Sequence, residues 1–196
     1  MKAKELFVSG LLTLVMGGLI VTGIGSAEER NRPFPSYGSG PVEVRLYTDY
    51  FCSPCREMEP TVEPILKELL KKNAIRLTLV DVPFNQHAPL YARNFLYASK
   101  ESNALEDAFR VRNVLQYAAA NKEITTQARI EGLFKEKGIA SRVWDPKPIF
   151  DRYNVLIKED KIDATPTCVV IMNGQKKTFV GGPDIISALN LLKALQ

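Results

Sequence analysis

Two closely spaced cysteines are the part of the sequence best suited to chemistry. Cys52 and Cys55 enclose Ser53 and Pro54 in the stretch YFCSPCREMEP, residues 50–60. Such a pair can be a structural disulfide, half of a metal site, or a reactive dithiol that exchanges disulfides. The function that we predict depends on which of the three applies.

The metal site and the structural disulfide are the weaker alternatives. A tetrahedral zinc site needs four sulfur or nitrogen ligands. After residue 27 the chain offers only Cys52, Cys55, Cys168 and one histidine, His87. These ligands come from three distant segments without a second paired motif, so we expect no metal. A disulfide across two residues closes a very small loop, and it therefore constrains the unfolded chain little.

The surroundings of the pair favour a reactive dithiol. Residues 41–49 alternate apolar and polar side chains as a strand does, and residues 54–72 form an amphipathic helix. Cys52 therefore stands just before a helix N-terminus, where free N–H groups and the helix dipole favour a thiolate. Pro54 suits the first helical turn. Cys55, one step further in, is positioned to attack a mixed disulfide on Cys52.

The rest of the chain predicts the order strand, helix, strand, helical block, hairpin, helix. A second strand covers residues 74–82, and helical spacing runs through residues 83–163. A strand at 166–172 leads into Asn173–Gly174, a strong signal for a two-residue hairpin turn. We expect Asp184 to cap the last helix.

The N-terminus predicts export. A charged start and an apolar run from Leu6 to Ile24 are followed by the small residues Gly25 and Ala27. This pattern is typical of a cleaved signal peptide over residues 1–27. The run is also long enough for an N-terminal membrane anchor, which is the alternative.

Charge and composition limit the remaining possibilities. Residues 28–40 are polar and rich in Pro and Gly, so we expect a flexible tether before a domain at 41–196. The formal net charge of +4 is small and spread along the chain, unlike the basic stripe of a nucleic-acid binder. We therefore expect no nucleic-acid partner.

Three motifs in order resemble the DsbA-like branch of the thioredoxin superfamily. YTDYFCSPC is similar to the strand end and C-x-x-C signature of that branch, Pro60 matches the proline of the active-site helix, and DATPTCVVIMNG resembles the segment with the cis-proline. The helical block, opened by HAPLYARNFLYA, lies where this branch inserts its helical subdomain. The resemblance implies an α/β thioredoxin fold with a helical insertion at about 84–163, between the second strand and the C-terminal β-hairpin.

The resemblance also implies the roles of the site residues. Pro166 is expected to be cis and packed against the dithiol, and Thr165 to offer backbone groups to a substrate strand. Ser53 and Pro54 are expected to tune the redox potential, which we place inside the range of about −120 to −270 mV spanned by family members. No cofactor is implied.

The implied function is disulfide exchange with cysteine-containing exported proteins. We expect it in the periplasm or at the cell-envelope exterior, in the oxidising direction, with a membrane redox partner that recycles the dithiol. Reduction or isomerisation is the alternative, because Ser53–Pro54 lacks the histidine found between the cysteines of strong oxidants. A non-catalytic module that binds extended peptides is a further alternative.

Several positions depart from the family pattern. Many members carry a buried acidic residue six positions before the first cysteine, where this chain has Leu46. Asp49 lies three residues nearer and is expected at the exposed end of the strand. Cys168 is expected to be a small core residue, and His87 a helix cap or a surface group.

Overall fold

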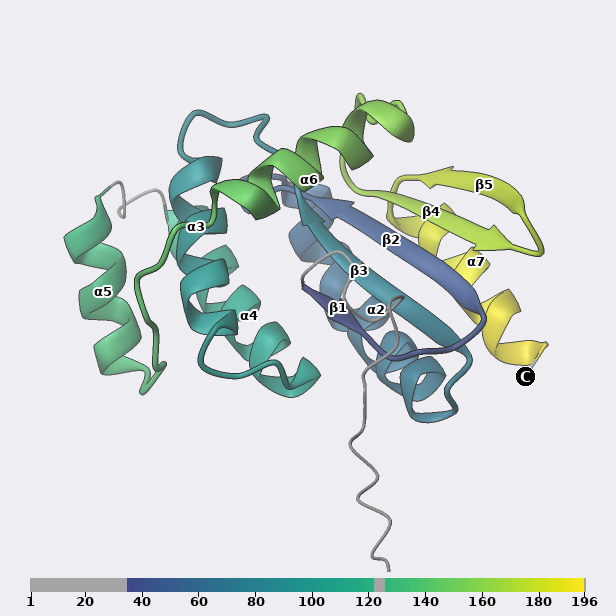
Figure 1. Ribbon diagram of the computed structural model, residues 1–196, viewed down its shortest axis with the longest axis horizontal. Coiled ribbons are helices and arrows are strands. Elements are labelled where there is room, and N and C mark those ends of the chain that lie inside the picture. Colours follow the sequence, from purple (N-terminus) through teal and green to yellow (C-terminus); the bar gives the residue numbers. More distant parts are fainter. Residues whose placement is uncertain (1–34, 122–125, 196) are drawn as a thin grey trace, which may run out of the picture. The chain divides into compact units, whose positions relative to one another are not determined.

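The computed structural model describes residues 35–121 and 126–195, which form a mixed sheet with helices on both faces (Figure 1). The strands are β1 (Ser36–Tyr37), β2 (Val42–Thr48), β3 (Ile75–Asp81), β4 (Thr167–Met172) and β5 (Gln175–Val180). The helices are α2 (Ser53–Lys71), α3 (Ala88–Ser99), α4 (Leu105–Asn121), α5 (Gln127–Glu136), α6 (Lys147–Glu159) and α7 (Gly182–Ala194).

The strand order β1-β3-β2-β4-β5 brings the predicted site residues to one edge of the sheet. β2 and β3 are parallel and are connected through α2, so both end at the same edge. β4 runs antiparallel to β2 and therefore begins at that edge. Asn173 and Gly174, with φ of 51° and 74°, form the predicted turn into β5.

Strand alternation divides the core between the two faces of the sheet. Leu46 and Cys168 point to the face on which α2 and α7 pack. Tyr47 and Val169, each one residue further along, belong to a second cluster with Leu156 of α6. α6 therefore covers the opposite face, while α3, α4 and α5 lie beyond the strand ends (Figure 1). The last helix of the predicted insertion is thus part of the packing of the sheet itself.

The predicted order of elements is confirmed, with two corrections. The structure places β1 inside residues 28–40, which we expected to be a tether. Tyr37 is buried there, and Leu79 N–H donates to the carbonyl of Pro35. Gly40 lies so close to the backbone of Ala74 that a Cβ atom would be only 2.3 Å from the Ala74 carbonyl carbon. These contacts attach residues 35–40 to the domain.

The second correction concerns the last helix. α7 begins at Gly182, so Asp184 lies in its first turn and is not its cap. The carboxylate still suits this position, because negative charge is favourable near a helix N-terminus.

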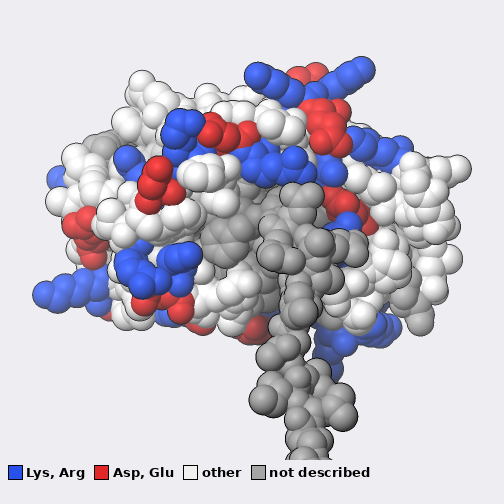
Figure 2. All heavy atoms as spheres, in the orientation of Figure 1, with Lys and Arg blue, Asp and Glu red and all other residues white. Residues whose placement is uncertain are grey.

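The predicted signal peptide or anchor at residues 1–27 lies outside the described residues. Within the described ranges, no helix has the length and apolar character needed to cross a bilayer. On the face drawn in Figure 2, basic and acidic side chains of the described residues are interspersed.

Candidate active site

The two cysteines form a disulfide at the N-terminus of α2. Cys52 is the N-cap residue, and its Sγ accepts a hydrogen bond from the backbone N–H of Cys55 at 3.1 Å. Cys52 is half-buried, Cys55 is fully buried, and the intervening Ser53 and Pro54 are exposed. The N-terminal turn therefore offers one sulfur to solvent and encloses the other.

The loop before β4 lies against the exposed sulfur. The Thr165–Pro166 peptide bond is cis, and the Thr165 carbonyl oxygen is 3.4 Å from Cys52 Sγ. Gly181 N–H, at the far end of the hairpin, donates to the carbonyl of Pro166 at 2.9 Å. The structure thus brings all six predicted residues together, because the start of β4 and the end of β2 share one edge of the sheet.

The expectation that Asp49 is exposed is wrong. Its side chain is buried, and its carboxylate accepts two backbone hydrogen bonds that compensate for the loss of water. Oδ1 accepts from Phe51 N–H at 2.7 Å, and Oδ2 accepts from Asn85 N–H at 3.0 Å. The Asp49 carbonyl accepts from Cys52 N–H at 3.1 Å. Asp49 therefore shapes the turn that presents Cys52.

Aromatic side chains support the same turn. The Phe51 ring packs edge-on against Tyr91 of α3, with ring centroids 4.9 Å apart, and lies 6.1 Å from the His87 ring. His87 occupies the N-cap position of α3, as expected, but its side chain makes no capping hydrogen bond. The helical block therefore contacts the residue next to the reactive cysteine.

A buried charged cluster lies behind the dithiol and was not predicted. Arg112 of α4 is 1% exposed and donates to Glu59 at 3.1 Å, to Asp81 at 3.1 Å and to Thr48 at 2.8 Å. Gln116 also donates to Glu59. Glu59 follows Cys55 by four residues, which is about one helical turn. The cluster therefore joins α2, β2, β3 and α4 directly beneath the second cysteine.

The charges in the cluster do not cancel. Two carboxylates face one guanidinium group, so the cluster carries one excess negative charge when both carboxylates are ionised. Burial raises the pKa of Asp81, although the Arg112 charge and hydrogen bond oppose this shift. Asp81 therefore holds its proton to a higher pH than an exposed aspartate.

The sequence contains a signal for this cluster. Glu59 stands on the apolar stripe of α2, between Cys55 and Val62, and Arg112 stands on the buried face of α4 between Phe109 and Leu115. A charged residue at a core position of a helix is rarely buried without a partner of opposite sign. What the sequence could not supply was which two charges pair.

Leu46 and Cys168 confirm the expected departures. They face each other across β2 and β4, and both are buried. Burial raises the pKa of the Cys168 thiol to about 12. Cys168 is therefore a core residue, and its sulfur is not poised for reaction. Within the described ranges, no three metal-ligating side chains gather closely enough to hold an ion.

Comparisons with known proteins agree with the predicted family. The family model described as thioredoxin matches residues 38–180. No curated protein sequence matches the chain. Solved structures of similar fold include alpha-DsbA1 of Wolbachia pipientis, at 15% identity, with a TM-score of 0.63, over 87% of this chain and 96% of that one.

Two further structures are similar. A periplasmic thioredoxin-like protein from Salmonella enterica serovar Typhimurium shares 18% identity, with a TM-score of 0.62, over 84% of this chain and 91% of that one. The catalytic domain of Proteus mirabilis ScsC shares 18% identity, with a TM-score of 0.61, over 86% of this chain and 94% of that one. The predictions of the thioredoxin family and of a DsbA-like α/β fold are confirmed.

Proposed function

Because this chain belongs to the thioredoxin family, we propose that it is an exported enzyme that exchanges disulfides with cysteine-containing proteins through Cys52 and Cys55. One observation carries the proposal. Cys52 Sγ lies at a helix N-terminus, accepts a hydrogen bond from the Cys55 N–H and is 3.4 Å from the Thr165 carbonyl oxygen. A sulfur in this position is stabilised as a thiolate and can be reached by a partner.

The proposed reaction begins with the disulfide form. A substrate thiolate attacks Cys52 Sγ, the bond between the two cysteines breaks, and Cys55 leaves as a thiolate that then takes up a proton. A second substrate thiolate attacks the substrate sulfur of the mixed disulfide. Cys52 leaves as a thiolate, and the substrate has gained one disulfide while the enzyme has become a dithiol.

The Thr165–Pro166 loop is proposed to hold the substrate. The Thr165 carbonyl faces the reactive sulfur, and Thr165 itself is half-buried, which leaves room for a partner chain. An extended peptide that donates a backbone hydrogen bond to this carbonyl would carry its own cysteine to Cys52.

We propose the oxidising direction, with a membrane redox partner that reoxidises the dithiol. The export predicted from residues 1–27 supports this direction, and the exposed Ser53–Pro54 pair supports reduction or isomerisation as the alternative. Equilibration with defined glutathione mixtures, followed by trapping of free thiols, should give a potential inside the range of about −120 to −270 mV. A value at the −120 mV extreme would contradict this expectation.

The test of the function itself is a trapping experiment with Cys55→Ala. This variant can form a mixed disulfide on Cys52 but cannot resolve it from within. Expressed with its full N-terminal segment, it should accumulate covalent, reductant-sensitive adducts with exported proteins. The matched control, Cys52→Ala, should accumulate none. Partners retained without covalent bonds, equally by both variants, would instead support the non-catalytic peptide-binding module.

A further inference from the structure

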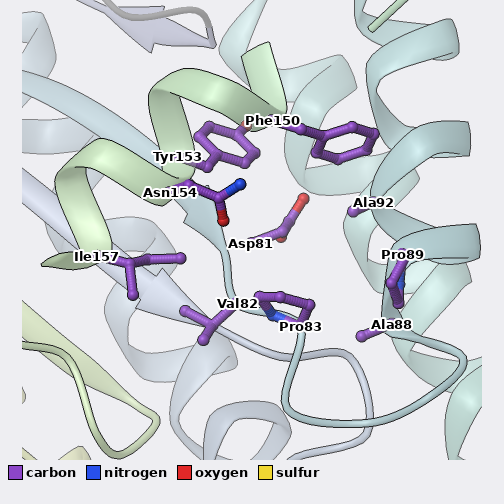
Figure 3. Close-up of a pocket in the computed structure, with 10 residues that line it drawn as sticks. All are labelled: Asp81, Val82, Pro83, Ala88, Pro89, Ala92, Phe150, Tyr153, Asn154 and Ile157. Carbon is purple, nitrogen blue, oxygen red and sulfur yellow. The ribbon is translucent and has the colours of Figure 1, made fainter. Parts of the chain in front are cut away.

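A second site lies where β3 meets the helical block. A cavity of about 140 Å³ opens between the end of β3, the start of α3 and α6 (Figure 3). Its wall is mostly apolar, formed by side chains that include Val82, Pro83, Ala92, Phe150 and Ile157. Its volume is close to the roughly 150 Å³ of an engineered apolar cavity that binds benzene. The cavity is therefore large enough for one six-membered ring.

The cavity is reachable from solvent. Pro83, Pro89 and Asn154 line it and are exposed, whereas Ala92 and Tyr153, which also line it, are buried. Pro83 lies in the loop after β3, Pro89 in α3 and Asn154 in α6. The cavity therefore has exposed side chains from three segments in its wall.

A buried carboxylate lies inside this apolar wall. Figure 3 shows the Asp81 side chain pointing from the end of β3 into the space beside Phe150 and Tyr153. Asp81 Oδ1 accepts a hydrogen bond from Arg112 at 3.1 Å, while Oδ2 accepts a longer one from Tyr50 Oη at 3.3 Å. Oδ2 therefore keeps capacity for a further donor, since a carboxylate oxygen can accept more than one hydrogen bond.

The same wall holds a polar group whose hydrogen-bonding capacity is unused. The Tyr153 hydroxyl is buried and has no hydrogen-bond partner among the described residues. Burial raises the pKa of Tyr153, and the Asp81 charge adds to this shift, so the hydroxyl lies within the field of the carboxylate. A buried hydroxyl without a partner is unfavourable, because it has lost its hydrogen bonds to water. A bound molecule with a polar head would satisfy it.

We propose that this cavity binds a small organic cation, with an apolar body the size of one ring and an ammonium group held by Asp81. The Glu59–Asp81–Arg112 cluster carries an excess negative charge when Asp81 is ionised, and an ammonium group beside Asp81 stabilises that ionised form, so the site selects a cation over an anion. The ammonium donates to Asp81 Oδ2 and to the Tyr153 hydroxyl oxygen, while the ring packs against Phe150 and Ala92. The site is separate from the proposed disulfide exchange and does not depend on it.

The test uses benzylamine and, as a neutral probe of nearly equal shape, benzyl alcohol. Each is titrated at pH 7 into the ¹⁵N-labelled protein, and amide shifts are followed by NMR. Both probes should shift amides around Val82, Ala92 and Phe150, and benzylamine should bind about tenfold more tightly because its hydrogen bond is charge-assisted. Equal affinities, or shifts located elsewhere, would overturn the proposal.

Two variants locate the site. Asp81→Asn keeps the shape and removes the charge, so it should abolish the tenfold preference for benzylamine. Asn154→Phe fills the entrance from an exposed position that the fold does not need, and it should abolish the binding of both probes. If Asp81→Asn does not fold, the proposal is still tested by the preference of the wild type for benzylamine and by the binding of both probes to Asn154→Phe. Unchanged binding to folded Asn154→Phe would refute the site.

Discussion

The start of α2 and its second turn place their polar side chains in opposite surroundings. At the start of the helix, Cys52 Sγ accepts one backbone hydrogen bond and lies 3.4 Å from the Thr165 carbonyl oxygen. In the second turn, Glu59 is held by Arg112 and Gln116 and is 2% exposed. In the proposed reaction the bonds of Cys52 change, and this residue lies at the surface end of the helix. A group that fixes the helix in place is fully enclosed.

Cys52 and Cys168 show the same difference for two residues of one type. Cys52 is half-buried at a helix N-terminus, while Cys168 is enclosed in β4, where burial raises the pKa of its thiol to about 12. A thiol that stays protonated is a poor nucleophile, because the thiolate is the reactive form. Position in the fold, and not residue type, therefore separates the reactive sulfur from the inert one.

The largest effect should come from removing the reactive sulfur. Cys52→Ala should lower the rate of disulfide exchange with a model dithiol peptide by at least about a thousandfold, because the nucleophile is lost. Cys168→Ala is the matched control and should leave the rate within about twofold. If the two variants lose activity equally, the contrast between the two sulfurs is wrong.

The second prediction addresses the enclosed turn. Arg112→Met leaves two buried carboxylates without their cation, and the free energy of unfolding should fall by about 3–5 kcal/mol. Urea unfolding followed by far-ultraviolet circular dichroism measures this change. The triple variant Arg112→Met, Glu59→Gln, Asp81→Asn removes every charge and should recover a large part of the loss. A triple variant no more stable than Arg112→Met would show that packing, and not charge, holds this turn.

Much of the fold could be predicted because its signals are local. The alternation of residues 42–48 gives the strand, Asn173–Gly174 gives the hairpin turn, and Gly138 marks the end of α5. The pair Cys52–Cys55 and its place at a helix start are local as well. Pro166 was placed at the site through the resemblance, since sequence spacing alone would favour a trans bond.

The remaining features depend on contacts between distant segments. Arg112 and Glu59 are 53 residues apart, and the residue pattern of neither helix predicts that they pair. Asp49 is buried because its carboxylate binds Asn85 N–H, 36 residues away. The two-residue strand β1 is held by pairing with β3 and is too short to produce a pattern. Tertiary contacts decide all three.

A smaller effect is expected from a second charge network, on the opposite face of the sheet. Burial by itself would raise the pKa of Asp160, but hydrogen bonds from Lys176, Tyr47 and Arg45 outweigh it and leave the pKa lowered. A carboxyl whose pKa is lower in the folded state stabilises the protein above its unfolded pKa of about 3.9. This contribution is lost as the pH falls through the lowered folded value.

Asp160→Asn tests this network. At pH 7 the variant should unfold with a free energy lower by about 1–3 kcal/mol, because hydrogen bonds to a charged group are lost. The difference from the wild type should narrow as the pH falls below about 4. Urea unfolding between pH 7 and pH 3 measures it, and a difference that does not change with pH would show that the Asp160 charge is not the cause.

The central claim is that Cys52 of the reduced protein is a stabilised, reachable thiolate. The direct measurement is the rate of alkylation by iodoacetamide as a function of pH, with the modified cysteine identified by mass spectrometry. We predict that Cys52 reacts first, with a midpoint below the pKa of about 8.5 of free cysteine, while Cys168 stays unmodified in the folded protein. A midpoint equal to that of free cysteine, or earlier reaction of Cys55, would contradict the account.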